Sequence, residues 1–244
     1  MIVLFTDFGL AGPYVGQMKA VLRREAPQVD VIDLFADAPA HDPKAAAYLL
    51  SAYATEFPAD TVFLCVVDPG VGGVRRPAVV QADGRWYVGP DNGLFEMVIR
   101  RAEGPARWWH ITWRPPRLSA TFHGRDLFAP VAAQIARNQA PSGREHPIDD
   151  IRRRDWPDDL AAVVYVDAFG NAMTGVRAAT VAADAVVRVG GRTLARAVTF
   201  EDVGPGEAMW YENANGLLEI AVNRGRADTV LGLRPGSPVD IVTG

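Results

Sequence analysis

TVFLCVVDPGVGGVRRP, residues 61–77, joins an apolar run to a glycine-rich turn. The apolar part, 61–67, is short and rich in β-branched residues, which favours a buried strand. The glycines that follow are typical of a turn in which the chain doubles back. Asp68 is therefore expected at the carboxyl end of a strand, which is where open α/β sheets bind their ligands. An aspartate at such a position is also a common turn former, so both interpretations of Asp68 stay open.

A phosphate-binding loop matches this stretch poorly. Gly70 and Gly72 fit the first two positions of G-x-G-x-x-G, but Arg75 occupies the third. The pattern G-x-x-x-x-G-K-[ST] does not occur, and the stretch follows the third expected strand rather than the first. We therefore interpret the glycines as turn residues rather than as a phosphate cradle.

Strand and helix patterns alternate over the first 140 residues. Strands are expected at 2–8, 29–35, 61–67 and 106–113, helices at 13–27, 42–57, from Gly93 and at 125–138, and a hairpin at 78–90 around Asp83-Gly84. Pro43 is placed to open the second helix. The alternation predicts an α/β N-terminal domain over residues 1–140, layered and with a largely parallel sheet.

The composition and the secondary-structure pattern of the chain change after residue 140. Residues 141–160 are rich in proline and charge, which predicts a linker. Short strands punctuated by glycines follow, without a good helix pattern, and predict a smaller all-β C-terminal domain over 161–244, a sandwich or a barrel. These strands are expected at 161–167, 185–190, 192–198, 207–213, 217–223 and 238–244.

Composition excludes several classes of protein. The 244 residues are 49% hydrophobic and carry a net charge of −4, which argues against a general nucleic-acid binder, since such proteins need a basic face. Cys65, the one cysteine, lies in an apolar run and is expected to be buried; a chain without an internal disulfide fits a reducing cytoplasm. No apolar run approaches the ~20 residues of a spanning helix, and no signal-peptide pattern is present. We expect a cytoplasmic protein that does not contact membranes.

Two further polar stretches of the N-terminal half are candidates for a site. Asp7 follows the first expected strand, and its carboxylate suits donors such as ribose hydroxyls, with an N-cap or Asx turn as the alternative. His123 lies in FHGRD, just before an expected helix. The four histidines lack metal-ligand spacing, so no metal site is expected. No nucleophile elbow occurs, and the position of Cys65 in a core strand disfavours a thiol nucleophile.

The C-terminal half offers a second group of polar residues. Asp167 ends an expected strand, and Phe169 and Asn171 follow it in a turn. An asparagine side chain both donates and accepts, which suits a purine edge, although a simple β-turn is the alternative. Arg224 has the geometry to clamp a carboxylate with two hydrogen bonds, or it is merely exposed.

Six blocks in this order give the chain a family resemblance: TDFG…PYVGQMK, VVDPGVGGVRR, VGPDNG, FHGRDLFAP, VDAFGN and ENANGLLEIAVNRGRA. Together they resemble the S-adenosyl-L-methionine hydroxide adenosyltransferases, the hydrolytic relatives of the fluorinases and chlorinases. The resemblance covers nearly the whole chain. It implies an α/β domain followed by a β-rich domain, and a homotrimer with the ligand between the N-terminal domain of one subunit and the C-terminal domain of the next. It also implies that water or hydroxide displaces methionine from C5′ of the ribose, with S-adenosyl-L-methionine as the small-molecule substrate and no cofactor.

The resemblance also implies roles for individual residues. The hydrolytic set falls on Asp68, Arg75 and His123, which the halogenating relatives lack. The substrate-binding set is Asp7 for the ribose diol, Asp167 for the methionine ammonium, Phe169 against the ligand, Asn171 at the adenine edge, and Asn223 and Arg224 near the methionine carboxylate. The chain departs from the family pattern at Gly12, which removes a polar contact to the methionine end, at Ala20, and at Asn223, where the halogenases have serine.

Two other functions stay open at this point. A halide-dependent adenosyl transferase would use the same fold, although the Arg75 and His123 signature argues against it. A non-catalytic adenosine or S-adenosyl-L-methionine binding protein would share the binding residues but form no product.

Overall fold

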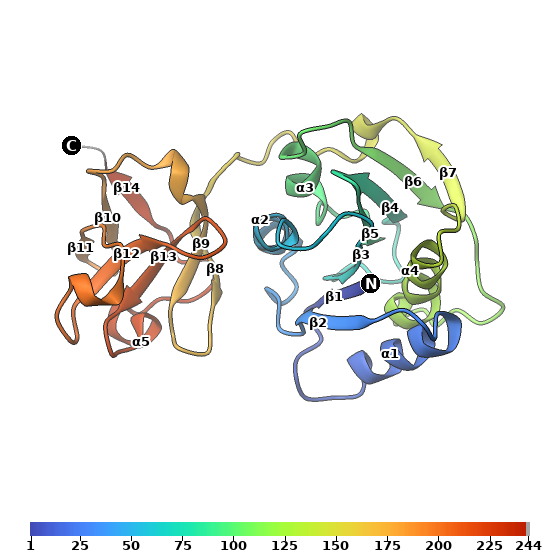
Figure 1. Ribbon diagram of the computed structural model, residues 1–244, viewed down its shortest axis with the longest axis horizontal. Helices are drawn as coiled ribbons and strands as arrows, with labels where there is room; N and C mark the ends of the chain where they lie inside the picture. The colour runs from blue at the N-terminus through green and yellow to red at the C-terminus, as the bar shows by residue number, and fades with distance from the viewer. Residues whose placement is uncertain (243–244) are drawn as a thin grey trace. The chain divides into compact units, whose positions relative to one another are not determined.

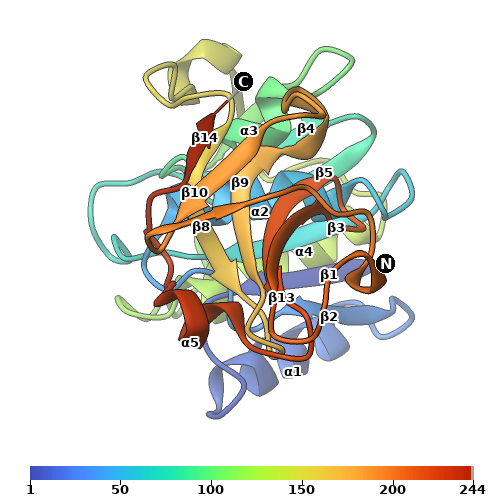
Figure 2. The same cartoon turned by 90° about the vertical axis from the view of Figure 1, so that its left-hand side faces the viewer.

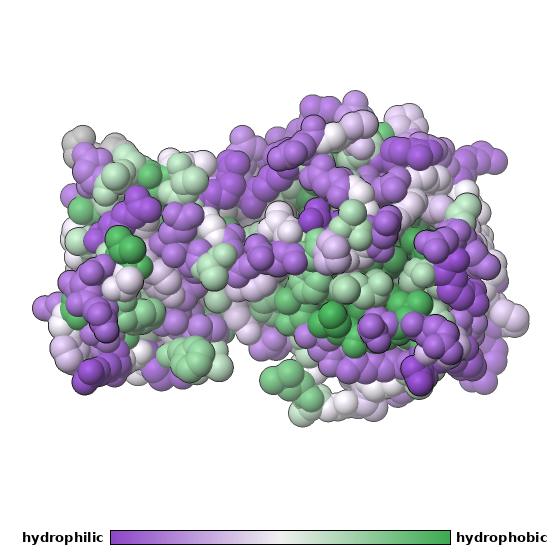
Figure 3. All heavy atoms as spheres, viewed as in Figure 1, coloured by the Kyte–Doolittle hydropathy of each residue, from purple (hydrophilic) through white to green (hydrophobic). Residues whose placement is uncertain are grey.

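The computed structural model describes residues 1–242 and divides the chain into two compact units. The first unit comprises Met1–Asp155, and the second begins at Trp156 (Figure 1). Charged and polar residues cover much of the face shown in Figure 3. This agrees with the 22% of charged residues in the sequence. Among residues 1–242, no helix has the length and apolarity needed to cross a bilayer.

The first unit is built on a seven-stranded sheet with the order β2-β1-β3-β5-β4-β6-β7. Its strands are β1 (Ile2–Thr6), β2 (Val31–Phe35), β3 (Val62–Val66), β4 (Pro77–Ala82), β5 (Arg85–Pro90), β6 (Arg107–Ile111) and β7 (Gly143–His146). β2, β1, β3 and β5 are mutually parallel, and β6 runs in the same direction because it and β5 both pair antiparallel with β4. The expected α/β unit with a largely parallel sheet is therefore confirmed.

Helices cover both faces of this sheet (Figure 1). They are α1 (Tyr14–Glu25), α2 (Pro43–Ala54), α3 (Glu96–Arg100), the π-helix η1 (Gly124–Phe128) and α4 (Ala129–Ala136). On one face, side chains of α1 and α4 form a core with Ile2 and Leu4 of β1. On the other face, Phe35 packs against Tyr53 of α2, with ring centroids 5.1 Å apart.

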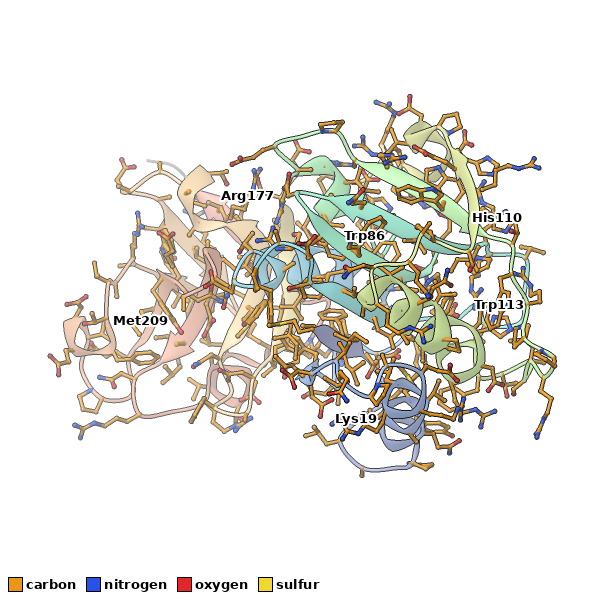
Figure 4. The ribbon with its side chains drawn as sticks, turned by 45° about the vertical axis from the view of Figure 1, so that its right-hand side comes forward. Lys19, Trp86, His110, Trp113, Arg177 and Met209 are labelled. Carbon is orange, nitrogen blue, oxygen red and sulfur yellow. The ribbon has the colours of Figure 1, made fainter. Side chains whose placement is uncertain are left out.

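Local sequence signals account for several of these boundaries. The side chain of Asp42 accepts a hydrogen bond from the Ala45 amide at 2.9 Å, so α2 begins with an N-cap followed by Pro43. Asp83 and Gly84 both have positive φ, 47° and 73°, as a two-residue hairpin turn requires. On β5, Trp86, labelled in Figure 4, packs against Trp109 of β6 with ring centroids 5.5 Å apart.

The segment 141–160, expected as a linker, contains regular elements in its first part. Strand β7 pairs with β6 and forms an edge of the first sheet, and a short 3-10 helix, η2 (Ile148–Ile151), follows it. The change of unit lies between Asp155 and Trp156. A high content of proline and charged residues therefore does not make this whole segment an unstructured linker.

A fully buried glutamate binds two residues of this segment, Arg152 and Arg153. Glu96 of α3 accepts hydrogen bonds from Arg100 Nη2 at 2.7 Å, Arg152 Nη2 at 3.1 Å and the Arg153 amide at 2.7 Å. Burial alone would raise the pKa of Glu96, but these donors outweigh it and lower the pKa below its usual value. The ion pairs fasten the end of the first unit to α3.

The second unit is formed by two antiparallel sheets, with orders β12-β13-β9-β8 and β11-β10-β14 (Figure 2). Its elements are β8 (Leu160–Val166), β9 (Ala172–Arg177), the 3-10 helix η3 (Ala178–Thr180), β10 (Val186–Val189), β11 (Arg192–Leu194), the 3-10 helix η4 (Phe200–Asp202), β12 (Ala208–Glu212), β13 (Leu217–Val222), α5 (Ala227–Leu231) and β14 (Asp240–Val242). Both sheets contribute to one core around the fully buried Trp210. The β-rich expectation is confirmed, with β9 and the short α5 as additions. Residues 243–244 of the last expected strand lie outside the described residues.

Candidate active site

Asp68 and Arg75 form a buried ion pair directly after β3. Arg75 Nε donates to both oxygens of the Asp68 carboxylate at 3.0 Å, and Nη2 donates to Oδ2 at 2.5 Å. The side chains are only 3% and 9% exposed, respectively. The glycine-rich turn between them therefore reverses the direction of the chain, so that the Arg75 side chain reaches the Asp68 carboxylate. This agrees with the interpretation of the glycines as turn residues.

His123 completes this group from a distant part of the chain. It precedes η1, and its Nδ1 lies 2.8 Å from Arg75 Nη2. A guanidinium carries only donors, so Nδ1 must be the acceptor, and the neutral ring carries its proton on Nε2. The geometry thus assigns the tautomer of His123.

The pKa of His123 is lowered from its usual value by burial and by the positive charge of Arg75, which outweigh the opposite effect of Asp68. Protonation would also remove the acceptor that Arg75 uses. The ring is therefore neutral at neutral pH.

Gly72 allows the turn that carries Arg75 to approach closely the segment that precedes His123. Its φ is 76°, and a Cβ built there would lie 2.4 Å from the carbonyl oxygen of Ala120. Only glycine allows these two backbones to approach so closely. Gly72 thus sets the spacing between the segment that carries Asp68 and Arg75 and the segment that carries His123.

If this site is catalytic, replacing Gly72 with alanine is expected to lower its rate by at least ~10-fold, because the two segments must separate and a shift near 1 Å is costly in catalytic sites. The matched control is Gly70→Ala in the same turn. A Cβ at Gly70 meets Arg75 Cγ at 3.5 Å, an ordinary contact, so this variant is expected to keep its rate. Steady-state kinetics and thermal melts of both variants provide the measurement; equal rates in the two would contradict this role of Gly72.

A cavity of about 260 Å³ lies beside the Asp68 carboxylate and the His123 ring. Its wall is partly aromatic: Tyr14 packs edge-on against Phe122 at 5.4 Å between centroids, and Phe8 lies 5.7 Å from both rings. The lining residues are Asp7, Phe8, Tyr14, His41, Val66, Asp68, Val71, Thr121, Phe122, His123 and Gly124. Three aromatic rings beside a few polar groups are typical of a small-molecule site.

Asp7 belongs to this cavity and does not cap a helix. It follows β1, its side chain is 8% exposed, and Oδ2 accepts a hydrogen bond from the His41 amide at 2.9 Å. The N-cap of α1 is Pro13, without a side-chain cap, so the N-cap alternative for Asp7 is wrong. His41, which sequence reasoning did not select, adopts φ 58° and lines the cavity with an exposed ring.

In the second unit, Asp167, Phe169 and Asn171 share one turn between β8 and β9. Asp167 Oδ1 accepts from the amides of Phe169 at 2.9 Å and Asn171 at 2.8 Å, and Oδ2 accepts from Asn171 Nδ2 at 3.3 Å. The β-turn considered as the alternative is therefore present, with the Gly170 amide donating to the Asp167 carbonyl at 3.0 Å, and it leaves 76% of the Phe169 surface exposed.

Asn223 and Arg224 follow β13. Asn223 Nδ2 donates to the Val203 carbonyl at 2.7 Å, whereas Arg224 is exposed and has φ 54°. Arg226, which was not predicted, donates to the Ala168 carbonyl at 2.8 Å and so ties this loop to the Asp167 turn. Within residues 1–242, no three His, Cys, Asp or Glu side chains gather in a way that could hold a metal ion.

Comparison with known proteins matches both units to one family. Residues 2–144 match the SAM hydroxide adenosyltransferase N-terminal domain, and 161–240 match the C-terminal domain. The (R)-S-adenosyl-L-methionine hydrolase of Thermus thermophilus is 41% identical, with 99% of each chain covered. The enzyme of the same name from Salinispora arenicola is 35% identical, with 98% of this chain and 96% of that protein covered.

A more distant relative and a solved structure are also similar to the chain over its whole length. The fluorinase of Nocardia brasiliensis is 24% identical, over 100% of this chain and 97% of the fluorinase. The crystal structure of an uncharacterized conserved protein from Thermotoga maritima superposes with a TM-score of 0.88 at 33% identity, with 100% of both chains covered. The order of blocks, the fold of both units and these matches lead to one assignment: the chain belongs to the SAM hydroxide adenosyltransferase family.

Proposed function

We propose that the protein hydrolyses S-adenosyl-L-methionine, in the (R) configuration at sulfur that the names of its relatives specify, to adenosine and L-methionine. Water forms a bond to C5′ of the ribose, the C5′–S bond breaks with its electron pair going to sulfur, and one proton is released. The observation that carries the proposal is the convergence of Asp68, Arg75 and His123 beside a cavity that also contains Asp7.

The chemistry needs a positioned water more than it needs an acid. A sulfonium leaves without protonation, whereas water is a poor nucleophile. Holding water in line with the C5′–S bond contributes several kcal/mol, with about 7–11 kcal/mol as the range for ideal alignment. With Nδ1 of His123 facing Arg75, the ring offers Nε2–H to the water oxygen, and Asp68 is the group that accepts a proton from the water. Arg75 holds both partners in place.

Asp7 is proposed to hold the ribose diol. One of its oxygens is engaged by the His41 amide, so the carboxylate is oriented with its other oxygen available to hydroxyl donors. We expect Asp7→Asn to raise KM by about 10- to 100-fold with a smaller change in kcat, because a charge-assisted hydrogen bond to the substrate is weakened. Steady-state kinetics would test this. A fall in kcat with KM unchanged would instead assign Asp7 to the chemical step.

The proposed reaction is tested with a mixture of the two sulfonium epimers. Adenosine and methionine should form in equal amounts, and the (R) epimer should disappear first, as chiral chromatography would show. No product despite tight nucleoside binding by calorimetry would favour the binding-protein alternative. A 5′-halo-nucleoside formed in chloride or fluoride would favour the transferase.

The second unit is proposed to bind the rest of the substrate, with Phe169 against the ligand, Asn171 at the adenine edge, Asp167 at the methionine ammonium, and Asn223 and Arg224 near its carboxylate. A cytoplasmic homotrimer, in which these residues meet the cavity of a neighbouring subunit, is also proposed from the family resemblance. Light scattering on the purified protein should give three times the chain mass of 26.4 kDa, and a monomer would contradict the trimer.

A further inference from the structure

The VGPDNG block, residues 88–93, is the one sequence block that the proposed reaction leaves without a role. Its residue Asn92 follows β5 and is partly buried. The Nδ2 group of Asn92 donates a hydrogen bond to the main-chain carbonyl of Val67 at 2.9 Å. Val67 is fully buried and directly precedes Asp68. Asn92 therefore holds the peptide unit that joins Val67 to the proposed proton acceptor.

The backbone on both sides fixes the orientation of the Asn92 amide. Its Oδ1 accepts a hydrogen bond from the Leu94 amide at 3.3 Å, and a main-chain N–H can only donate. The Val67 carbonyl can only accept, so Nδ2 must face it. Between Asn92 and Leu94, Gly93 adopts a φ of 100°, which favours glycine. An asparagine satisfies both neighbours, whereas an aspartate has no donor for the carbonyl.

A side chain is needed at this point because the main-chain pairing of β3 with β5 stops before Val67. The last paired residues are Leu64 and Val88. β5 ends at Pro90, and a proline has no N–H that could continue the hydrogen bonds to β3. A buried carbonyl without a donor costs free energy comparable to a lost hydrogen bond. The Asn92 amide supplies the donor that the backbone of β5 does not.

The neighbouring carbonyl of β3 is held from the opposite side. The Asp7 amide, which follows β1, donates to the Val66 carbonyl at 3.3 Å. Asn92, which follows β5, donates to the next carbonyl. The carboxyl end of β3 is thus fixed between two donors directly before Asp68. Displacing this end would move the Asp68 carboxylate, and a shift near 1 Å is costly in a catalytic site.

We propose that Asn92 is a positioning residue: it holds the peptide unit before Asp68 and so sets where the Asp68 carboxylate meets Arg75. The effect extends to His123, because the Nη2 group of Arg75 that binds Asp68 also donates to His123 Nδ1. The inference rests on the proposed function for its kinetic readout. Its structural consequence at His123 can be measured without turnover.

Replacing Asn92 with aspartate keeps the hydrogen bond to Leu94 but turns a carboxylate oxygen toward the Val67 carbonyl. The two oxygens repel each other, so the Asp68 carboxylate shifts and kcat should fall at least ~10-fold. Adenosine binding, measured by calorimetry, should be retained because Asp7 is unchanged. Asn92→Ala removes the donor without adding repulsion and should lower kcat at least ~3-fold, which keeps the test open if the aspartate variant does not fold. A wild-type kcat in the folded variants would overturn the proposal.

Thr61→Val is the matched control on the same strand. Thr61 is 1% exposed, directly precedes β3, and its Oγ1 donates to the Pro58 carbonyl at 2.8 Å. Valine also leaves a main-chain carbonyl without its side-chain donor, but at the end of β3 remote from Asp68. The Tm of this variant should fall as it does in the Asn92 variants, while kcat stays at the wild-type value. A comparable loss of kcat in Thr61→Val would contradict the proposal, because any weakening of β3 would then lower the rate.

A double-mutant cycle separates a positioning role from a merely structural one. Because Asn92 acts through the Asp68 carboxylate, the variant with both Asn92→Asp and Asp68→Asn should have the kcat of Asp68→Asn alone. If the two losses multiplied instead, Asn92 would affect the rate independently of Asp68, and the proposal would be wrong.

The tautomer of His123 gives a readout that needs no turnover. The neutral ring carries its proton on Nε2 as long as Arg75 donates to Nδ1, so ¹⁵N NMR of the imidazole at about pH 8 should show this form in the wild type and in Thr61→Val. In Asn92→Asp, the shifted Asp68 carboxylate draws Arg75 away from the ring, and the Nδ1–H form should appear beside the first.

The resonances of His123 are identified as those that His123→Gln lacks. A His123 signal in folded Asn92→Asp that is identical to the wild-type signal would refute the inference. The tautomer change in a protein whose wild type does not hydrolyse S-adenosyl-L-methionine would instead support the positioning role and count against the proposed function alone.

Discussion

Replacing Asp68 with asparagine is expected to lower kcat by about 10²- to 10⁴-fold, the range typical for loss of a positioned proton acceptor. The asparagine keeps the shape of the side chain but cannot take a proton from water, and it weakens the hold on Arg75, which also positions His123. Ligand binding should persist, because Asp7 and the aromatic wall of the cavity are unchanged. Single-turnover kinetics and nucleoside binding by calorimetry measure the two effects separately.

Stability has to be measured alongside, because removing one partner of a buried ion pair costs about 3–5 kcal/mol. Asp91→Asn provides the matched control: Asp91 is 6% exposed, pairs with Arg76 at 2.8 Å, and is not among the residues that line the cavity. We expect a comparable loss of stability with kcat preserved. If Asp68→Asn retained wild-type kcat, Asp68 would have no part in the chemical step.

Replacing His123 with glutamine is expected to lower kcat about 100-fold and to change its pH dependence. Because the pKa of His123 lies below its usual value of about 6.5, wild-type activity should persist at pH 6.5 and be lost as the pH falls through that lowered pKa. Protonation would replace an acceptor for Arg75 with a second positive charge. The pH profile of kcat/KM should therefore lose its acid limb in His123→Gln.

His110 supplies the control for this profile. Burial also lowers the pKa of His110, but this residue lies on β6 and is not among the residues that line the cavity. His110→Gln should leave the acid limb in place, and an acid limb that disappears there instead would contradict the assignment.

The stability of the protein should also fall as the pH is lowered. Below pH 6.5 the unfolded chain binds more protons at His123 than the folded chain does. The free energy of unfolding therefore falls from about pH 6.5 toward the folded-state pKa of His123.

Sequence patterns were sufficient for the features that depend on neighbouring residues. The strand 61–67 with Asp68 at its end, the Asp83-Gly84 hairpin and the Asp42-Pro43 start of α2 are all local, and the structure has each of them. The meeting of His123 with Arg75 is different. It spans 48 positions along the chain, and only the family resemblance indicated it.

Other features depend on partners that no local pattern reveals. The hydrogen bonds of Arg152 and of the Arg153 amide to the buried Glu96 cannot be read from the proline- and charge-rich segment that contains them. Strand β7 has little apolar character and forms because β6 offers an edge. His41 reaches the cavity through a left-handed backbone position, and the tautomer of His123 follows from one distance to Arg75. In each case the deciding interaction joins residues far apart in sequence.

Hydrolysis of S-adenosyl-L-methionine in H₂¹⁸O, followed by mass spectrometry, tests most directly whether Asp68, Arg75 and His123 direct a water to C5′. The account predicts adenosine with one ¹⁸O in its 5′-hydroxyl and methionine without label. Unlabelled adenosine, or methylthioadenosine as the nucleoside product, would contradict it.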